Sequence, residues 1–156
     1  MVVDWRLKAV AEQQGGYFTA RQATECGYPY NMQCYHTRTG NWQKIDRALF
    51  RLPGYLDCLE AEFTRWSLWA AGQGKKRRAV VCRESALYYY GLGGSRPEAF
   101  DLSVNALRHD TASEQCRLHL EELAQEEIAE EAGFLITTPL KTLRDLRPDL
   151  LYRRCW

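Results

Sequence analysis

The sequence predicts an α+β protein, with short helices and a β-hairpin at the front and a mixed α/β body behind them. Three observations support this class. Segments with helical spacing, separated by Gly and Pro, fill residues 4–40. Apolar and polar residues then alternate over 42–52, as expected of a hairpin. Beyond that hairpin, helix-like and strand-like segments follow one another, so we expect two units at residues 1–56 and 57–156.

The composition is that of a folded globular protein. The chain has 156 residues, of which 46% are apolar and 26% are charged. No apolar run is long enough to span a bilayer, and the first ten residues lack the basic-then-apolar order of a signal peptide. We therefore expect a cytoplasmic protein with no membrane partner.

The six cysteines are scattered along the chain, with no CxxC pair and no histidine at zinc-finger spacing. Cys34 and His36 form only an isolated C-x-H. We therefore expect no metal site and no cofactor. In a cytosolic protein the thiols should stay reduced and mostly buried.

Charge is distributed unevenly although the net charge is only +1. Residues 1–56 hold seven Lys/Arg and four Asp/Glu, a balance of +3, whereas residues 113–156 hold six and nine, a balance of −3. A basic front and an acidic back are compatible with a DNA-contacting head on a body that faces another partner.

Capping signals define the first two helices. Asp4 is placed to cap a first helix that ends at Gly15-Gly16. Tyr17-Phe18 gives a short apolar step. Thr19 can then cap a second helix, which Gly27 ends.

A short polar helix is predicted next, with Asn31 as its cap and Gly40 just past its end. One face of this helix is more apolar and is expected to point inward; it carries Met32, Tyr35 and His36. The other face offers an amide, a hydroxyl and a guanidinium, which are groups that bind base edges or phosphates; it carries Gln33, Thr37 and Arg38. Gln33 could instead turn inward if the helix is rotated by one position.

The hairpin over 42–52 has its predicted tip at Asp46-Arg47-Ala48 and three basic residues, Lys44, Arg47 and Arg51. Three short helices followed by a hairpin make a winged helix-turn-helix, whose wing can lie along a phosphate backbone. An ordinary hairpin with a solvated face is the alternative. The candidate DNA-contacting residues are Thr19, Arg21, Asn31, Gln33, Thr37, Arg38, Lys44, Arg47 and Arg51.

Several motifs occur in order along the chain: GGYFTARQA at 15–23, Gly27, Tyr35-His36, Gly40-Asn41-Trp42, RALFRLP at 47–53, SALYYYGL at 85–92 and TTPLKTLRDL at 137–146. Together they resemble the AbiEi family, antitoxins and transcriptional regulators of type IV toxin–antitoxin systems. The chain departs from the family at Ala48, where a glycine is usual, and at Arg83, where histidine is frequent.

This resemblance implies an N-terminal winged helix-turn-helix that binds double-stranded operator DNA and represses its own toxin–antitoxin operon. It also implies that residues 57–156 form the antitoxin or interaction domain. The toxin in such systems is a nucleotidyltransferase-like protein, so that toxin or its target is a candidate partner. The operator sequence and the oligomeric state do not follow from the resemblance.

The body is predicted to begin with a helix over 57–74. The run Lys75-Lys76-Arg77-Arg78 follows, either as a second phosphate contact or as a solvated loop. The remaining predicted elements are strands at 79–82, 99–106, 116–120 and 134–137 and helices at 84–90 and 139–146. The paired glutamates between 121 and 131 are expected to form a charged helix or loop face.

Enzyme motifs are missing from the sequence. It has no glycine-rich phosphate loop and no G-x-S-x-G, Ser85 has no evident base, and the three histidines are isolated. We therefore expect no catalytic residues. One alternative is a protein–protein interaction module that does not bind DNA. Another is a nuclease relative, for which the chain after Asp149 leaves no room.

Overall fold

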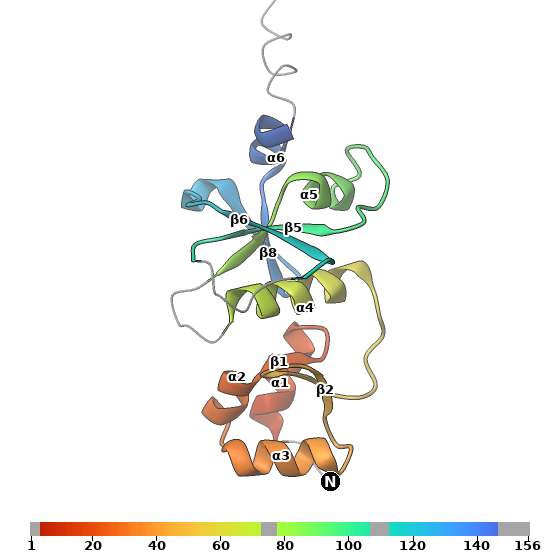
Figure 1. Ribbon diagram of the computed structural model, residues 1–156, viewed down its shortest axis with the longest axis vertical. Coiled ribbons are helices and arrows are strands. Elements are labelled where there is room, and N and C mark those ends of the chain that lie inside the picture. The colour runs from red at the N-terminus through yellow and green to blue at the C-terminus, as the bar shows by residue number, and fades with distance from the viewer. Residues whose placement is uncertain (1–3, 73–77, 107–112, 147–156) are drawn as a thin grey trace, which may run out of the picture.

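The computed structural model describes residues 4–72, 78–106 and 113–146 and confirms the α+β class. The described residues form six α-helices and two β-sheets (Figure 1). We call residues 4–52 the head and residues 59–146 the body. None of the helices in the described part of the chain is long and apolar enough to cross a membrane.

The head contains three helices and a three-stranded antiparallel sheet in the strand order β1-β3-β2. Its elements are α1 Trp5–Gln13, β1 Tyr17–Thr19, α2 Ala20–Glu25, α3 Tyr30–Arg38, β2 Gln43–Asp46 and β3 Leu49–Arg51. This order is compatible with the predicted winged helix-turn-helix, with α2 and α3 as the paired helices and β2–β3 as the hairpin.

Local capping explains where α1 and α2 begin. The Asp4 carboxylate accepts a hydrogen bond from the Arg6 amide at 2.8 Å. Thr19 and Gln22 form a reciprocal capping box, in which each side chain accepts from the other's backbone amide. Both predicted caps are confirmed. Behind them an aromatic core packs Phe18 edge-to-face on Trp42, with the ring centroids 4.9 Å apart.

The hairpin turns at Arg47-Ala48, as predicted, and Ala48 has φ +59°. An L-residue with a Cβ is strained in this left-handed region by about 1–2 kcal/mol, whereas glycine is not. The turn therefore forms with a residue poorly suited to it.

Ala48→Gly is expected to raise the free energy of unfolding by about 1 kcal/mol, because it removes that strain. Ala9→Gly is the matched control, since Ala9 is exposed in the middle of α1 and the same substitution there should cost about 1 kcal/mol. Urea unfolding of both variants measures whether the free energy of unfolding rises in Ala48→Gly and falls in Ala9→Gly. A loss of stability in Ala48→Gly would contradict the strained turn.

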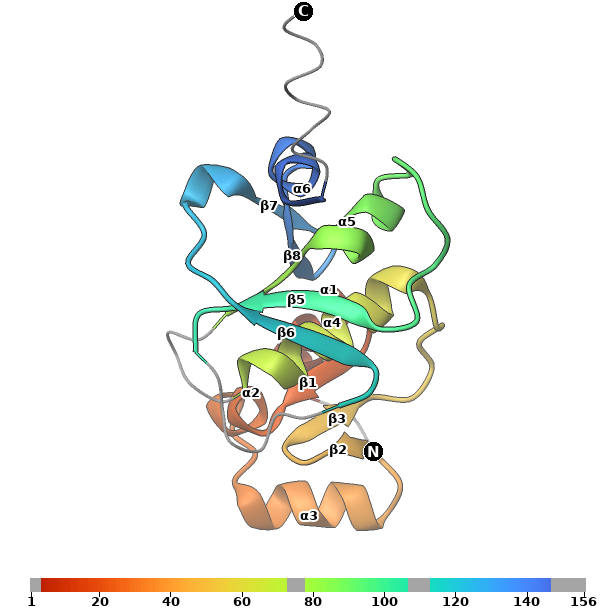
Figure 2. The ribbon, with the colours of Figure 1, turned by 45° about the horizontal axis from the view of Figure 1, so that its top comes forward.

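The body is a five-stranded mixed sheet in the order β6-β5-β4-β8-β7. Pairs β5/β6 and β4/β8 are parallel, and β4/β5 and β7/β8 are antiparallel. α4 covers one face of the sheet, and α5 and α6 lie on the other (Figure 2). The elements are α4 Leu59–Ala71, β4 Ala79–Val81, α5 Arg83–Tyr89, β5 Phe100–Val104, β6 Cys116–Leu120, the 3-10 turn η1 Gln125–Glu127, β7 Ile128–Glu131, β8 Phe134–Thr137 and α6 Pro139–Leu146.

The glutamate-rich segment differs from its prediction. Instead of only a charged helix or loop face, it contains a 3-10 turn and the edge strand β7. Glutamate has a low β propensity, so the sequence did not indicate a strand here. The segment is a strand because it pairs antiparallel with β8 through the turn at Gly133.

Of the basic run, residues 75–77 lie outside the described residues. Arg78 is exposed, and its guanidinium donates to the Leu123 carbonyl at 3.0 Å.

Head and body are in direct contact, with α4 lying between the head and the five-stranded sheet (Figure 1). A small core joins Tyr17 and Leu49 of the head to Ala61 of α4. At a second contact, the β7–β8 turn packs on the end of α1: a Cβ at Gly133 would lie 2.3 Å from the Gln13 carbonyl oxygen. Each unit also has its own larger core. The boundary between 56 and 57 therefore falls in a linker whose two sides are packed together.

The five cysteines in the described residues are all free. Cys26, Cys82 and Cys116 are buried, and burial raises the pKa of the Cys82 and Cys116 thiols to about 12. Cys34 and Cys58 are exposed. The expectation of mostly buried thiols therefore holds for three of these five residues.

Candidate nucleic-acid interface

α3 lies across the end of the head that is farthest from the body (Figure 1). One side of this helix packs on the head through Gln33 and His36, which are 4% and 5% exposed. The opposite side is open to solvent over two turns and carries Asn31, Cys34, Tyr35 and Arg38. We call these four residues the outer face of α3.

The predicted rotation of α3 was wrong. Met32 and Tyr35, which were expected to point inward, are 38% and 43% exposed. Gln33, which was expected to point outward, is buried, and its amide NH2 lies 3.1 Å from the Ala20 carbonyl oxygen and 2.8 Å from that of Tyr28. Because α2 and the turn after it supply acceptors for this amide, burying it costs little and fastens α3 to α2. Gln33 is therefore not available to bases.

Two more expectations for α3 need correction. Asn31 does not cap the helix, because α3 begins at Tyr30, two residues earlier than predicted, and Pro29 occupies the N-cap position without a side-chain hydrogen bond. Asn31 is instead exposed on the outer face. Thr37 is half-buried, and its hydroxyl donates to the Gln33 carbonyl oxygen at 2.8 Å. It therefore lies at the margin of the outer face.

His36 attaches α3 to the core of the head. Its ring stacks on Trp42, with centroids 4.9 Å apart and an angle of 20° between the planes. Asn41 hydrogen bonds to His36 Nδ1 at 3.1 Å. Burial lowers the pKa of His36, so the ring is expected to be neutral at pH 7. This residue is a core histidine, as an isolated histidine usually is.

Two exposed cations come from the hairpin. Lys44 on β2 and Arg47 at the tip are both exposed, as predicted for residues that would lie along phosphates. The Asp46 carboxylate accepts from the Arg47 amide at 2.7 Å and shapes the turn. Together with Asn31 and Arg38, these two residues are the sequence-predicted candidates that are exposed.

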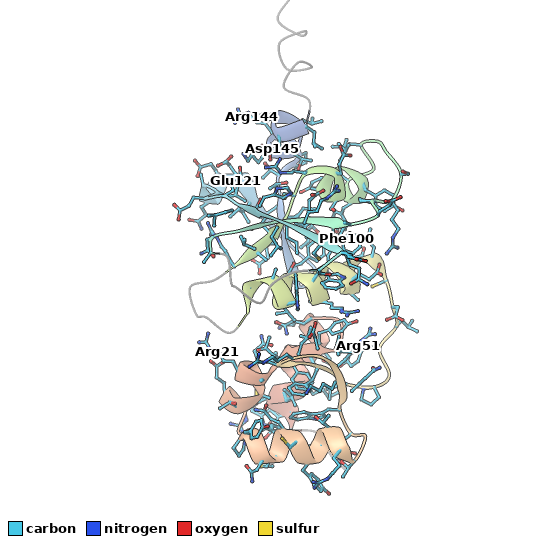
Figure 3. All side chains as sticks on the ribbon, viewed as in Figure 1. Arg21, Arg51, Phe100, Glu121, Arg144 and Asp145 are labelled. Carbon is cyan, nitrogen blue, oxygen red and sulfur yellow. The ribbon has the colours of Figure 1, made fainter. Side chains whose placement is uncertain are left out.

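Arg51 does not belong to this surface (Figure 3). It is 8% exposed, its Nη1 lies 2.5 Å from Asp57 Oδ1, and its Nε and Nη2 donate to the carbonyls of Gly15 and Leu56. Its guanidinium also lies over the Tyr17 ring, 4.5 Å from the centroid. The strand alternation that suggested an outward cation was misleading, because the linker folds back over this side of β3. Arg51 fastens that linker to the head.

Arg51→Met should lower the free energy of unfolding by about 2 kcal/mol, because the charge-assisted bonds to Asp57 and to two carbonyls are lost. It should leave the salt dependence of any DNA binding unchanged. Arg47→Met is the matched control, with unchanged stability and a weaker salt dependence. Urea unfolding and DNA titrations of both variants test this assignment. If Arg51→Met kept full stability but reduced the salt dependence of DNA binding, Arg51 would be an exposed phosphate contact and the assignment would be wrong.

Thr19 and Arg21, the two candidate DNA contacts at α2, lie in different environments. Thr19 is 6% exposed and acts as the N-cap of α2, which removes it from the candidate surface. Arg21 projects from α2 (Figure 3), and its Nε lies 3.1 Å from Glu25 Oε1. Arg21 is half-buried, and its ion pair with the exposed Glu25 contributes little.

The body holds a separate polar cluster at the far end of the molecule. Lys141 on α6 lies between three carboxylates, with Nζ 3.0 Å from Glu121 Oε1, 3.5 Å from Glu127 Oε2 and 2.9 Å from Asp145 Oδ1. The positive charge of the Lys141 ammonium partly neutralises these carboxylates. The part of the chain that the structure describes holds no group of three His, Cys, Asp or Glu arranged for a metal ion.

Two residues weighed in the sequence for catalysis have structural partners. The Ser85 hydroxyl accepts from the backbone amide of Asp101 at 2.9 Å. His119 is not isolated, since its Nε2 lies 2.9 Å from Asp101 Oδ1. Arg117 Nε also lies 3.1 Å from that oxygen. Arg117 and His119 on β6 thus both contact the buried Asp101 carboxylate on β5.

Cys34 and Tyr35 are the outer-face residues that the sequence analysis missed. The alternative rotation, in which Gln33 points inward, places them on this face. The chain matches no protein-family model and no curated protein in sequence comparisons. The functional argument therefore rests on the residues of this surface.

Proposed function

We propose that the protein is a DNA-binding transcriptional regulator in which α3 enters the major groove and the β2–β3 hairpin follows the phosphate backbone. One observation carries this proposal: α3 lies at the end of the head farthest from the body (Figure 1) and presents an open face with Asn31 and Arg38, and Lys44 and Arg47 of the hairpin are also exposed. An amide and a guanidinium are the groups that read adenine and guanine, and two exposed cations on the hairpin suit phosphates.

The resemblance to AbiEi-like antitoxins supports a more specific role within the same proposal: a cytoplasmic repressor of its own toxin–antitoxin operon, without catalytic activity. The body would then face the partner side, and a nucleotidyltransferase-like toxin or its target is the candidate partner. An adjacent reading frame for such a toxin would support this role. The acidic balance of residues 113–156 favours contacts with a protein over contacts with DNA.

The test is a fluorescence titration of the whole chain with labelled duplex DNA at several salt concentrations. Affinity should fall steeply as salt rises, and Arg47→Ala should reduce the salt slope by roughly one unit. Arg144→Ala is the matched control, because Arg144 is an exposed arginine on α6 at the opposite end of the molecule (Figure 3). It should change nothing.

Two outcomes would reject the proposal. The first is the absence of binding at the lowest salt concentration, which would favour an interaction module that does not bind DNA. The second is an equal loss of affinity in Arg144→Ala and Arg47→Ala, which would mean that binding is spread over the whole surface.

A further inference from the structure

We propose that the outer face of α3 reads a short run of base pairs in which adenine and guanine lie about three steps apart with a thymine methyl between them. Asn31 would take the adenine, Arg38 the guanine, and Cys34 with Tyr35 the thymine methyl. This inference rests on the proposed function and deepens it. It specifies which bases the bound DNA would carry and in what spacing, which the fold alone does not.

Spacing along the helix sets the length of the run. Asn31 and Arg38 are seven residues apart, which is about 10.5 Å along the axis and only about 20° around it. Base pairs are stacked about 3.4 Å apart, so a helix lying along the groove would place these side chains about three steps apart. Both are exposed, on the side opposite the buried Gln33 and His36.

The two ends of the face differ in chemistry. Asn31 is in the first turn, and its amide carries both a donor and an acceptor, the pair that matches adenine N6 and N7. Arg38 is the last residue of α3, and its guanidinium matches the two acceptors of guanine, O6 and N7. A helix start close to the bases is also the usual arrangement in helix-turn-helix proteins.

The middle of the face is weakly polar. Cys34 is an exposed thiol and Tyr35 is 43% exposed, with its ring packed edge-on to the His36 ring at 5.3 Å. Because His36 is fixed in the core, Tyr35 is braced and keeps its ring on the outer face. The Cys34 thiol is a weak hydrogen-bond donor and the Tyr35 ring is apolar apart from its hydroxyl, so these side chains can bury the methyl group that distinguishes thymine in the major groove.

The experiment begins with selection of preferred duplexes from a randomised pool by the wild-type protein. Single-atom analogues are then placed in the selected site: uracil for thymine, 7-deazaadenine for adenine and 7-deazaguanine for guanine. Each should weaken wild-type binding at one position, by roughly 5- to 100-fold for the two purines and less for the lost methyl.

Variants then assign each position to a residue. Asn31→Ala should abolish the penalty of 7-deazaadenine and leave the other two unchanged. Cys34→Ser combined with Tyr35→Ser should abolish the uracil penalty alone, and Arg38→Ala the 7-deazaguanine penalty alone. Lys44→Ala is the control, because an exposed lysine on the hairpin should weaken all duplexes alike and change no penalty.

The outcomes separate this inference from the function on which it rests. Tight, salt-dependent binding with no selected sequence, or with penalties that no outer-face variant changes, would overturn the base assignments and leave DNA binding intact. Failure to bind any duplex at low salt would overturn both. Loss of the matching penalty in each variant would support the assignments.

Discussion

Lys141→Met is expected to lower the free energy of unfolding by about 3–4 kcal/mol. The substitution keeps a long side chain but removes the ammonium that faces Glu121, Glu127 and Asp145. All four side chains are less than one-third exposed, so water screens the remaining repulsion poorly, and removing one partner from a buried ion network costs far more than the network itself contributes.

The pH dependence of this loss has a definite sign. Burial raises the pKa of Glu121, but the hydrogen bond and charge of Lys141, the hydrogen bond from Ser103 and the charge of Arg83 together outweigh it, and the pKa lies below its ordinary 4.5. A lowered carboxyl pKa stabilises the fold above the unfolded value, and this contribution disappears as pH falls through the lowered value. The difference between wild type and Lys141→Met should therefore be largest near pH 7 and shrink as the solution is acidified below about pH 4.5.

Urea unfolding at neutral and acidic pH measures this difference. Lys8→Met is the matched control, because Lys8 Nζ lies 3.9 Å from Glu12 Oε1 in a pair with both side chains more than half exposed. Its effect should stay below about 0.5 kcal/mol at every pH. A Lys141→Met variant as stable as the control would mean that the three carboxylates are well solvated and do not need the lysine.

Gly133→Ala is expected to destabilise the protein by about 3 kcal/mol through the contact between head and body. Gly133 has φ +92°, which strains any residue with a Cβ, and the new Cβ would lie 2.3 Å from the Gln13 carbonyl oxygen. Gly54→Ala is a close control, since Gly54 has the same φ of +92° and nothing within 4 Å of its added Cβ.

The difference between these two glycine variants isolates the contact from the backbone strain. We expect Gly54→Ala to cost about 1–2 kcal/mol and Gly133→Ala to cost more, with faster proteolysis in the linker between β3 and α4. Equal costs would show that the β7–β8 turn does not press on α1 in solution. Head and body would then behave as units joined only by that linker.

The sequence predicted the parts of the fold that short-range chemistry determines. Thr19 was predicted to cap the second helix and does so, with Gln22 three residues later completing a capping box, and the hairpin tip at 46–48 was predicted from its neighbours. The helix over 139–146 was predicted at its observed bounds, because Thr138 precedes a proline at the first helical position. In each case the determining contacts lie within a few residues.

The errors arose where distant contacts decide. Gln33 looks solvent-exposed by its polarity, yet acceptors on Ala20 and Tyr28 make its burial favourable. Arg51 looks like a wing cation, yet Gly15, Leu56 and Asp57 surround its guanidinium. The candidate surface depends on these cases, because they rotate the reading face of α3 by one position and remove one cation from the hairpin. Asn31, Arg38, Lys44 and Arg47 remain from the original set.

The measurement that tests the account most directly is the ratio of operator to random-DNA affinity for Arg38→Ala and Arg47→Ala at one fixed salt concentration. Arg38 lies on the outer face of α3, so its loss should cost about 1–3 kcal/mol on the preferred duplex and little on random DNA, and the ratio should collapse. Arg47 lies at the hairpin tip, so its loss should weaken both duplexes alike and preserve the ratio. A ratio that collapses in Arg47→Ala and survives in Arg38→Ala would contradict the account, because the hairpin and not α3 would then read the sequence.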